Sequence, residues 1–199
     1  SYLDINEIAS VTKRPQDVIG LHFFSPANVM KLLEIVRAKH TSDTVVATSM
    51  DLAKKIGKVA ALAGVCPGFI GNRMLARRQQ TAAYLVQAGA MPWDIDAAFN
   101  KFGFKMGPFQ MSDLAGLDIG WKPGAKTANP LRDMICERTP RRGQKSGAGY
   151  YDYDAARNGT PSPEVEVIVK EYQANSGVAA RKVTHEEILE ECVFSMINE

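Results

Sequence analysis

The stretch from Gly20 to Glu34 constrains the fold of this chain more than any other, because two apolar, β-branched runs flank a turn. Leu21 to Phe24 and Val29 to Val36 are typical of strands, and the Ser-Pro-Ala-Asn sequence between them is rich in turn-forming residues. The stretch therefore predicts a β-hairpin. Because strand side chains alternate between two faces, a loop between the runs places His22 and Glu34 opposite each other on one face.

A histidine and a glutamate in this arrangement can work as an acid–base pair. A carboxylate on one imidazole nitrogen fixes the tautomer, stabilises the imidazolium and leaves the other nitrogen to take a proton from a substrate. The alternative is that His22 is a histidine of the core and Glu34 a solvated carboxylate at a sheet edge. Only the acid–base pair requires a hydrogen bond between the two side chains, so their contact distinguishes the interpretations.

Composition limits the classes of function that remain. The chain has 199 residues, of which 45% are apolar and 23% charged, which is enough for one large domain or two small ones. A net charge of +2 does not favour nucleic-acid binding, and the pair Arg141-Arg142 is expected on a solvated surface. No apolar run approaches the roughly 18 residues of a membrane span. Three widely spaced cysteines favour free thiols in a reducing interior compartment over disulfides or a zinc site.

The first 64 residues are typical of the end of an α/β unit. Ser1 to Gly20 predicts a short helical turn at most. A helix is expected from Thr44 to Ile56, and one more strand from Lys58 to Ala63. Asp43 is the expected cap of that helix and Gly57 its stop. Since strands follow almost at once, the earlier strands of such a unit are expected to be absent from this sequence.

From residue 65 onward the pattern changes to helices. Apolar spacing, proline starts and glycine stops predict five of them. The expected helices run from Pro67 to about Gln87, from Asp94 to Phe102, from Pro108 to about Leu117 with Gly116 interrupting it, from Leu131 to Cys136, and from Thr184 onward with Glu187 in a capping box. Residues 143–151 predict a glycine-rich loop that leads into a short extended piece, and residues 158–163 predict a linker.

The hairpin sequence Gly-Leu-His-Phe-Phe-Ser-Pro-Ala-Asn-Val-Met-Lys-Leu-Leu-Glu closely resembles the active-site segment of the L-3-hydroxyacyl-CoA dehydrogenase family, particularly in multifunctional fatty-acid β-oxidation enzymes. Four more motifs resemble the family in order: Pro-Gly-Phe-Ile-Gly-Asn-Arg at 67–73, Gly-Phe-Lys-Met-Gly-Pro-Phe at 103–109, Asp-Leu-Ala-Gly-Leu-Asp at 113–118, and the loop around Lys145. The resemblance implies NAD-dependent oxidation of 3-hydroxyacyl-CoA to 3-ketoacyl-CoA. It also implies a mainly α fold with a small α/β remnant: the end of a Rossmann-like NAD-binding domain, residues 1–64, followed by an all-helical domain, residues 65–199.

The resemblance further implies roles for five residues. His22 is the expected general base for the hydroxyl proton, Glu34 orients it, and Asn72 lies beside the reacting oxygen. Ser1 is expected to touch both nicotinamide and substrate, and Lys145 to reach toward the bound cofactor. By residue type alone, Asn72 is also compatible with a helix-capping or surface role, Lys145 with a solvated loop lysine and Ser1 with an ordinary terminus.

Two departures from the family pattern stand out. The fingerprint Gly-x-Gly-x-x-Gly is absent, so the main phosphate-binding site for NAD is expected outside these 199 residues. The second helical repeat of the multifunctional members begins near residue 184 and stops after its first helix. The sequence is therefore interpreted as an N-terminally truncated fragment that, alone, neither binds NAD appreciably nor turns over substrate, and that tends to associate through its exposed sheet.

Two other functions are compatible with the sequence: an NAD-dependent dehydrogenase of another hydroxy acid, and a helical dimerisation or docking module with vestigial strands. The expected partners are a 3-hydroxyacyl-CoA substrate and either a second copy or the other domains of a multifunctional enzyme. Nucleic acid, a metal ion and a membrane span are not expected. A bacterial, cytoplasmic parent is the first expectation for the compartment, and a peroxisomal one the alternative.

Overall fold

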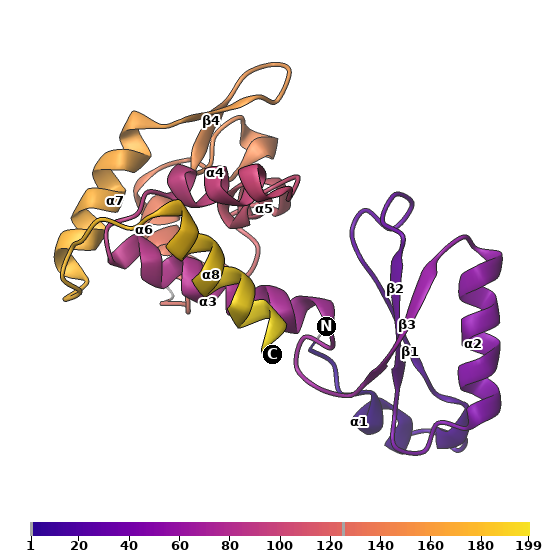
Figure 1. Ribbon diagram of the computed structural model, residues 1–199. Coiled ribbons are helices and arrows are strands. Elements are labelled where there is room, and N and C mark those ends of the chain that lie inside the picture. The colour runs from indigo at the N-terminus through magenta and orange to yellow at the C-terminus, as the bar shows by residue number, and fades with distance from the viewer. Residues whose placement is uncertain (1, 125) are drawn as a thin grey trace. The chain divides into compact units, whose positions relative to one another are not determined.

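The computed structural model describes residues 2–124 and 126–199. The chain divides into two compact units, residues 1–76 and residues 77–199. The first unit combines a small sheet with short helices, whereas the second is mostly helical (Figure 1). The division falls inside helix α3, Gly71–Gln87, and each unit is described by itself below.

Three strands form the sheet described in the first unit, in the order β1-β2-β3. Strands β1, Gly20–Phe23, and β2, Leu32–Arg37, are antiparallel and form the predicted hairpin. Strand β3, Val59–Gly64, confirms the strand predicted from Lys58 to Ala63 and runs parallel to β2 on its other side. Strand β2 is therefore the central strand, and both of its edges are paired.

Each face of β2 packs against a different helix. Leu33 and Ile35 pack with Ala53 of helix α2, Asp43–Lys55, which covers one face of the sheet in Figure 1. Val36 packs on the opposite face with Ile5 of helix α1, Ile5–Ser10. The alternation of side chains along a strand explains how one short strand supplies two small cores.

In the first unit, one predicted helix cap is wrong and one predicted helical turn is longer than expected. The N-cap of α2 is Ser42, whose side chain accepts a hydrogen bond from the Val45 amide at 3.4 Å. Asp43, the predicted cap, lies one position inside the helix and pairs with Arg37 at 2.8 Å. The region before β1 contains the six-residue helix α1 and a 3-10 turn, η1, Pro15–Asp17, which is more helix than the sequence predicted.

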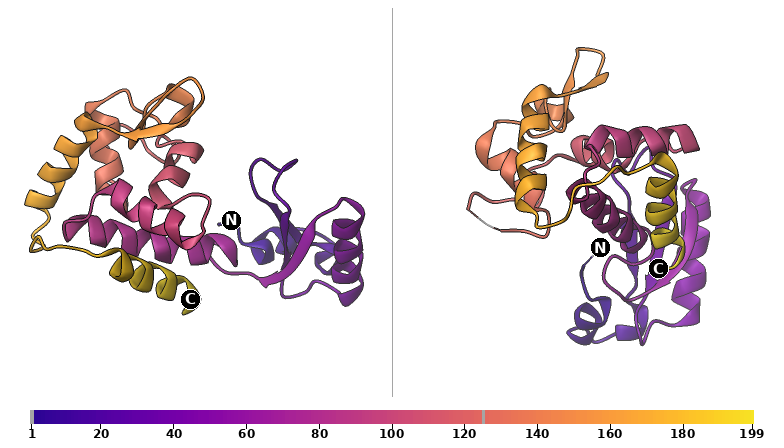
Figure 2. Two further views of the ribbon diagram at one scale, coloured as in Figure 1. Left: turned by 45° about the horizontal axis from the view of Figure 1, so that its top comes forward. Right: turned by 60° about the vertical axis from the view of Figure 1, so that its left-hand side comes forward.

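In the second unit, helices surround one apolar core whose fully buried side chains include Leu85, Phe99, Ile135 and Tyr150. Helix α4 packs against α5 and α8, and α6 packs against α7. Besides the residues of α3, the described elements are α4 Pro92–Phe102, α5 Pro108–Ala115, α6 Pro130–Arg138, η2 Gln144–Ser146, β4 Tyr151–Tyr153, β5 Gly159–Pro161, α7 Pro163–Asn175 and α8 His185–Ile197. The β4–β5 hairpin projects from these helices in both views of Figure 2.

Several predictions for the second unit were wrong. Gly116 is the C-cap of α5 with φ 108° and does not lie within the helix, because glycine relieves the strain of that conformation at a helix end. Residues 159–161 pair with β4, so the stretch 158–163 is not a linker. Helix α7 was missed, although proline at its start and helical spacing of its apolar residues indicate it. Its buried residues are Val165, Ile168, Val169 and Tyr172.

Arg141 is also not on a solvated surface, because its side chain is only 7% exposed. Its guanidinium donates to the carbonyl oxygens of Gly149 at 2.6 Å and Tyr151 at 3.0 Å, and it pairs with Asp152 at 2.5 Å. A planar guanidinium with several donors can satisfy a loop of backbone acceptors in this way. Arg141 therefore holds the glycine-rich loop, which a count of charges along the sequence could not reveal.

Two buried aspartates, Asp96 and Asp113, organise the same region. Asp113 accepts hydrogen bonds from the backbone amides of Tyr150 and Tyr151, at 2.9 and 3.1 Å, and from the Tyr153 hydroxyl at 2.9 Å. Burial raises the pKa of both aspartates to about 6, and the hydrogen bonds they accept limit that rise. A Cβ at Gly149 would lie 2.0 Å from an Asp113 oxygen, so this position of the loop accepts glycine alone.

Candidate active site

The hairpin brings His22 of β1 directly opposite Glu34 of β2, the pairing expected from strand alternation. The Nδ1–H of His22 donates to Oε2 of Glu34 at 2.6 Å. The Glu34 side chain is fully buried and that of His22 is 19% exposed. The contact that the acid–base interpretation requires is therefore present, and Glu34 is not a solvated carboxylate at a sheet edge.

The second oxygen of the Glu34 carboxylate binds the beginning of helix α3. Oε1 accepts hydrogen bonds from the backbone amides of Ile70, at 3.0 Å, and Gly71, at 2.7 Å. These amides and the positive end of the helix dipole stabilise the buried negative charge. The carboxylate is thus held at both oxygens, which fixes the direction in which it orients the imidazole.

Two phenylalanine rings flank the imidazole of His22. Phe24 meets it edge-on with ring centroids 4.8 Å apart, and Phe69 does so at 5.4 Å. Such edge-to-face contacts restrict rotation of the ring and exclude water from its sides. A Cβ at Gly71 would lie 2.9 Å from Phe24. Glycine at this position therefore lets the Phe24 ring and the Glu34 carboxylate both pack against the start of α3.

The loop before α3 explains why that helix begins later than predicted. Gly68 and Phe69 have φ values of 79° and 50°, which an α-helix does not contain. Pro67 therefore precedes the helix and does not form its first turn. The loop buries the Phe69 ring against His22 and aims the first amides of α3 at Glu34. Phe24, Phe69 and Gly71 were not identified from the sequence, because only the folded loop brings them to the histidine.

The other predicted site residues have different positions. Asn72 lies in the first turn of α3, directly after the Gly71 amide that binds Glu34. Lys145 belongs to the second unit, where its ammonium pairs with Asp118 at 2.6 Å and this pairing lowers the pKa of the Asp118 carboxyl. Ser1 lies outside the described residues. Asn72 thus directly follows the residue whose amide binds Glu34, whereas Lys145 is held by a partner in its own unit.

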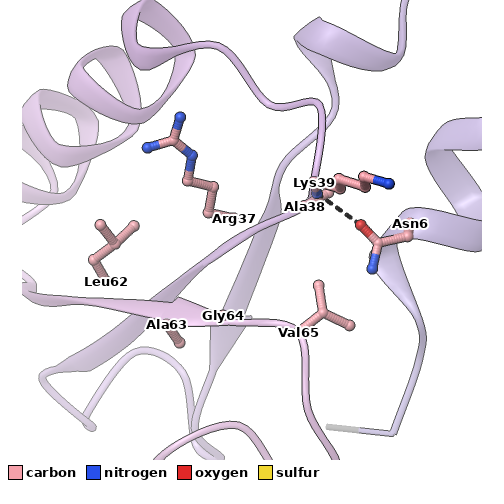
Figure 3. Close-up of a pocket in the computed structure, with 8 residues that line it drawn as sticks. All are labelled: Asn6, Arg37, Ala38, Lys39, Leu62, Ala63, Gly64 and Val65. Carbon is pink, nitrogen blue, oxygen red and sulfur yellow. Dashed lines mark hydrogen bonds between the residues drawn. The ribbon is translucent and has the colours of Figure 1, made fainter.

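A pocket of about 660 Å³ opens at the carboxyl ends of β2 and β3 (Figure 3). Arg37, Leu62 and Val65 contribute to its lining, and the Lys39 amide donates to Oδ1 of Asn6 at 2.7 Å on its rim. Neither His22 nor Glu34 lines it. Its ionisable lining residues are the cations Arg37, which is paired with Asp43, and Lys39, so it offers no carboxylate–imidazole pair of the kind that His22 and Glu34 form.

The helices that follow β2 and β3 begin where an α/β domain can cradle a pyrophosphate. Such a cradle uses backbone amides at a helix N-terminus after a strand. The first amides of α3 are occupied by Glu34, whose charge would repel a phosphate, and Ser42 caps α2. The first amides of α3 are therefore engaged by Glu34, and the start of α2 is engaged in part by Ser42. Among the described residues, no group of three or more His, Cys, Asp or Glu side chains is arranged to hold a metal ion. The helices described in this structure are also too short or too polar to cross a membrane.

Two family models match the chain in succession. The NAD binding domain of 3-hydroxyacyl-CoA dehydrogenase matches residues 1–65, and the C-terminal domain of the same enzyme matches residues 68–153. The chain belongs to the 3-hydroxyacyl-CoA dehydrogenase family. This membership confirms the family and the fold class that the hairpin and its companion motifs indicated.

Known members of this family extend the comparison over the whole chain. The peroxisomal bifunctional enzyme of Cavia porcellus is 47% identical over the full chain, and a peroxisomal fatty acid β-oxidation multifunctional protein of Arabidopsis thaliana is 37% identical. The dehydrogenase part of multifunctional enzyme 1 from C. elegans superposes over the whole chain with a TM-score of 0.70 at 32% identity, and 46% of that structure is covered. The chain spans about 30% of the length of these two relatives.

Proposed function

We propose that this chain carries the acid–base centre of an NAD-dependent L-3-hydroxyacyl-CoA dehydrogenase, which oxidises the 3-hydroxyl group to a ketone in fatty-acid β-oxidation. One observation carries the proposal: the His22 imidazole is bound to a fully buried carboxylate that is itself anchored on the start of α3. A docking module has no need for a buried carboxylate held in this way. Family membership and the β-oxidation enzymes among its relatives support the same conclusion.

The proton transfer follows from the geometry of the pair. Glu34 accepts the Nδ1–H of His22, so Nε2 is the nitrogen that takes the hydroxyl proton as the C3–H hydride leaves. NAD, when bound, would supply the hydride acceptor. The Glu34 charge then stabilises the imidazolium that has formed, and the rings of Phe24 and Phe69 keep the imidazole in one orientation.

Three further roles belong to the proposal. Asn72, in the first turn of α3, donates a hydrogen bond to the oxygen that becomes a carbonyl, and Ser1 contacts both that oxygen and the nicotinamide. Lys145 serves the cofactor, which requires it to exchange its contact with Asp118. We assign residues 1–64 to the nucleotide-binding domain and residues 65–199 to the helical domain, whose second helical repeat begins near residue 184. Because Glu34 occupies the amides of α3, the main phosphate site of NAD lies outside the described residues.

The cellular compartment and the packing partners of the parent enzyme are inferred from its relatives. The relatives from Cavia porcellus and Arabidopsis thaliana are both described as peroxisomal, so we propose a peroxisomal parent in preference to the bacterial, cytoplasmic one that the sequence suggested. The other domains of that enzyme, or a second copy, are the proposed packing partners. A dehydrogenase of another hydroxy acid remains the competing function within the enzymes.

The substrate class is testable with a longer chain that includes a complete dinucleotide-binding domain. We expect NADH absorbance to rise with 3-hydroxybutyryl-CoA and not with free 3-hydroxybutyrate at equal concentration. Equal or faster reduction of NAD with the free acid would contradict the CoA assignment and favour the competing function.

The cofactor assignment predicts that the 199-residue chain alone does not bind NAD in a calorimetric titration. The reason is that phosphate contacts supply much of the affinity, and the amides at the start of α3 are already used. The longer chain, titrated in the same buffer, is the positive control. Micromolar binding to the short chain, about −8 kcal/mol, would show that the phosphate site lies within it.

A further inference from the structure

A second pocket lies in the helical unit beside the β4–β5 hairpin. Its volume is about 190 Å³, and Lys105, Gln110, Gln144, Tyr153 and Arg157 are among the residues that line it. Lys105 comes from the segment between α4 and α5, and Arg157 from the turn between β4 and β5. Two cations that are far apart in the sequence therefore meet at one small opening. None of these residues belongs to the proposed acid–base centre.

The polar groups of this pocket are mainly hydrogen-bond donors. The Tyr153 hydroxyl donates to Asp113 at 2.9 Å, and burial together with the Asp113 charge raises its pKa, so the phenol keeps its proton and that proton is already engaged. Oε1 of Gln110 accepts the Gly107 amide at 2.9 Å and the Asn100 side chain at 3.2 Å. The amide nitrogen of Gln110 is thereby left as the donor. A ligand in this pocket consequently meets ammonium, guanidinium and amide N–H groups.

The charge of the pocket is not neutralised by the carboxylates around it. Asp152 pairs with Arg141 at 2.5 Å, and Asp154 accepts two hydrogen bonds from Asn158, at 2.8 and 2.9 Å. Within residues 2–124 and 126–199, neither Lys105 nor Arg157 has an ion-pair partner. Two unpaired cations and an amide donor favour a doubly charged anion with several acceptor oxygens.

We propose that this pocket binds a phosphate group, either inorganic phosphate or the phosphate of a monoester. A phosphate dianion matches the two cations, and its oxygens accept from a guanidinium in bidentate fashion. The site is independent of the proposed dehydrogenase chemistry, because its residues all lie in the second unit and His22 and Glu34 in the first.

Titration of the 199-residue chain with inorganic phosphate, followed by NMR at constant ionic strength, tests the proposal. We expect saturable shifts of the Lys105 and Arg157 amide signals, and about tenfold weaker binding in Arg157→Gln and in Lys105→Gln, since each substitution removes one charged hydrogen bond. Lys101→Gln is the matched control, because Lys101 is an exposed lysine on α4 that does not line the pocket. Its affinity for phosphate should equal that of the unmodified chain.

A parallel titration with adenosine 3′,5′-bisphosphate separates the two sources of phosphate. Tighter binding of the bisphosphate at the same signals supports a nucleotide-borne phosphate, and equal or weaker binding supports free phosphate. A third titration, with acetate, tests whether any anion binds as well as phosphate. Absence of saturable shifts, stronger binding of acetate than of phosphate, or equal weakening by Lys101→Gln would each overturn the proposal. Unchanged far-UV circular dichroism of the variants ensures that a loss of binding does not reflect unfolding.

Discussion

Replacing His22 with glutamine is expected to lower kcat by about 10²- to 10⁴-fold with little change in KM, in a chain that includes the complete dinucleotide-binding domain. Glutamine has a similar reach and can still donate to Glu34, so the local packing is retained. It cannot take up a proton, however, and hydroxyl oxidation then proceeds without a general base. Steady-state kinetics with 3-hydroxybutyryl-CoA and NAD measure both parameters.

The matched control for this substitution is His40→Gln. His40 is exposed and lies in the loop between β2 and α2, so its replacement should leave kcat unchanged. Glu34→Gln should give an intermediate loss, because the amide still bonds to the imidazole but adds no negative charge to stabilise the imidazolium. Full activity of His22→Gln would remove the catalytic assignment.

Replacing Asp113 with alanine is expected to lower the free energy of unfolding of the second unit by about 2–4 kcal/mol. The substitution leaves the buried amides of Tyr150 and Tyr151 and the hydroxyl of Tyr153 without their acceptor. Each unpaired buried donor costs about 1–3 kcal/mol, and removal of the desolvated carboxylate offsets part of that cost. Trp93 and Trp121, the two tryptophans of the chain, both lie in this unit, so their fluorescence follows its unfolding in urea.

Two variants serve as comparisons for Asp113→Ala. Glu190→Ala removes an exposed carboxylate from α8 and should change the free energy of unfolding by less than about 0.5 kcal/mol. Asp113→Asn keeps one acceptor oxygen and should cost less than the alanine substitution. If Asp113→Ala is as stable as Glu190→Ala, the aspartate does not organise the loop as described.

The pH dependence of the same substitution follows from the pKa of Asp113, which burial raises to about 6. In the unfolded chain the carboxyl loses its proton near its ordinary value, 3.8. Between about pH 4 and 6 the folded state therefore binds more protons, so the contribution of Asp113 to stability is complete below about pH 4 and declines as pH rises through 6. The loss of unfolding free energy caused by Asp113→Ala should thus be larger at pH 5 than at pH 7. Urea unfolding at both pH values measures this difference.

The sequence by itself determined the hairpin and its register. Strand alternation places side chains in fixed order across a hairpin, so His22 and Glu34 follow from the two apolar runs and the turn between them. Helices α2, α4 and α8 were also predictable, because caps, glycine stops and apolar spacing are local signals. Five ordered motifs were sufficient to indicate the family, which the two matching family models confirm.

Only the tertiary structure decided how those elements are held together. The second oxygen of Glu34 binds amides 36 and 37 residues away, and Arg141 and Asp113 satisfy loop groups that no sequence period connects to them. Such contacts arise because a buried polar group must find a partner wherever the folded chain brings one, irrespective of distance along the sequence. Local periodicity contains information about neighbouring residues, whereas these partnerships depend on how separate elements pack against one another.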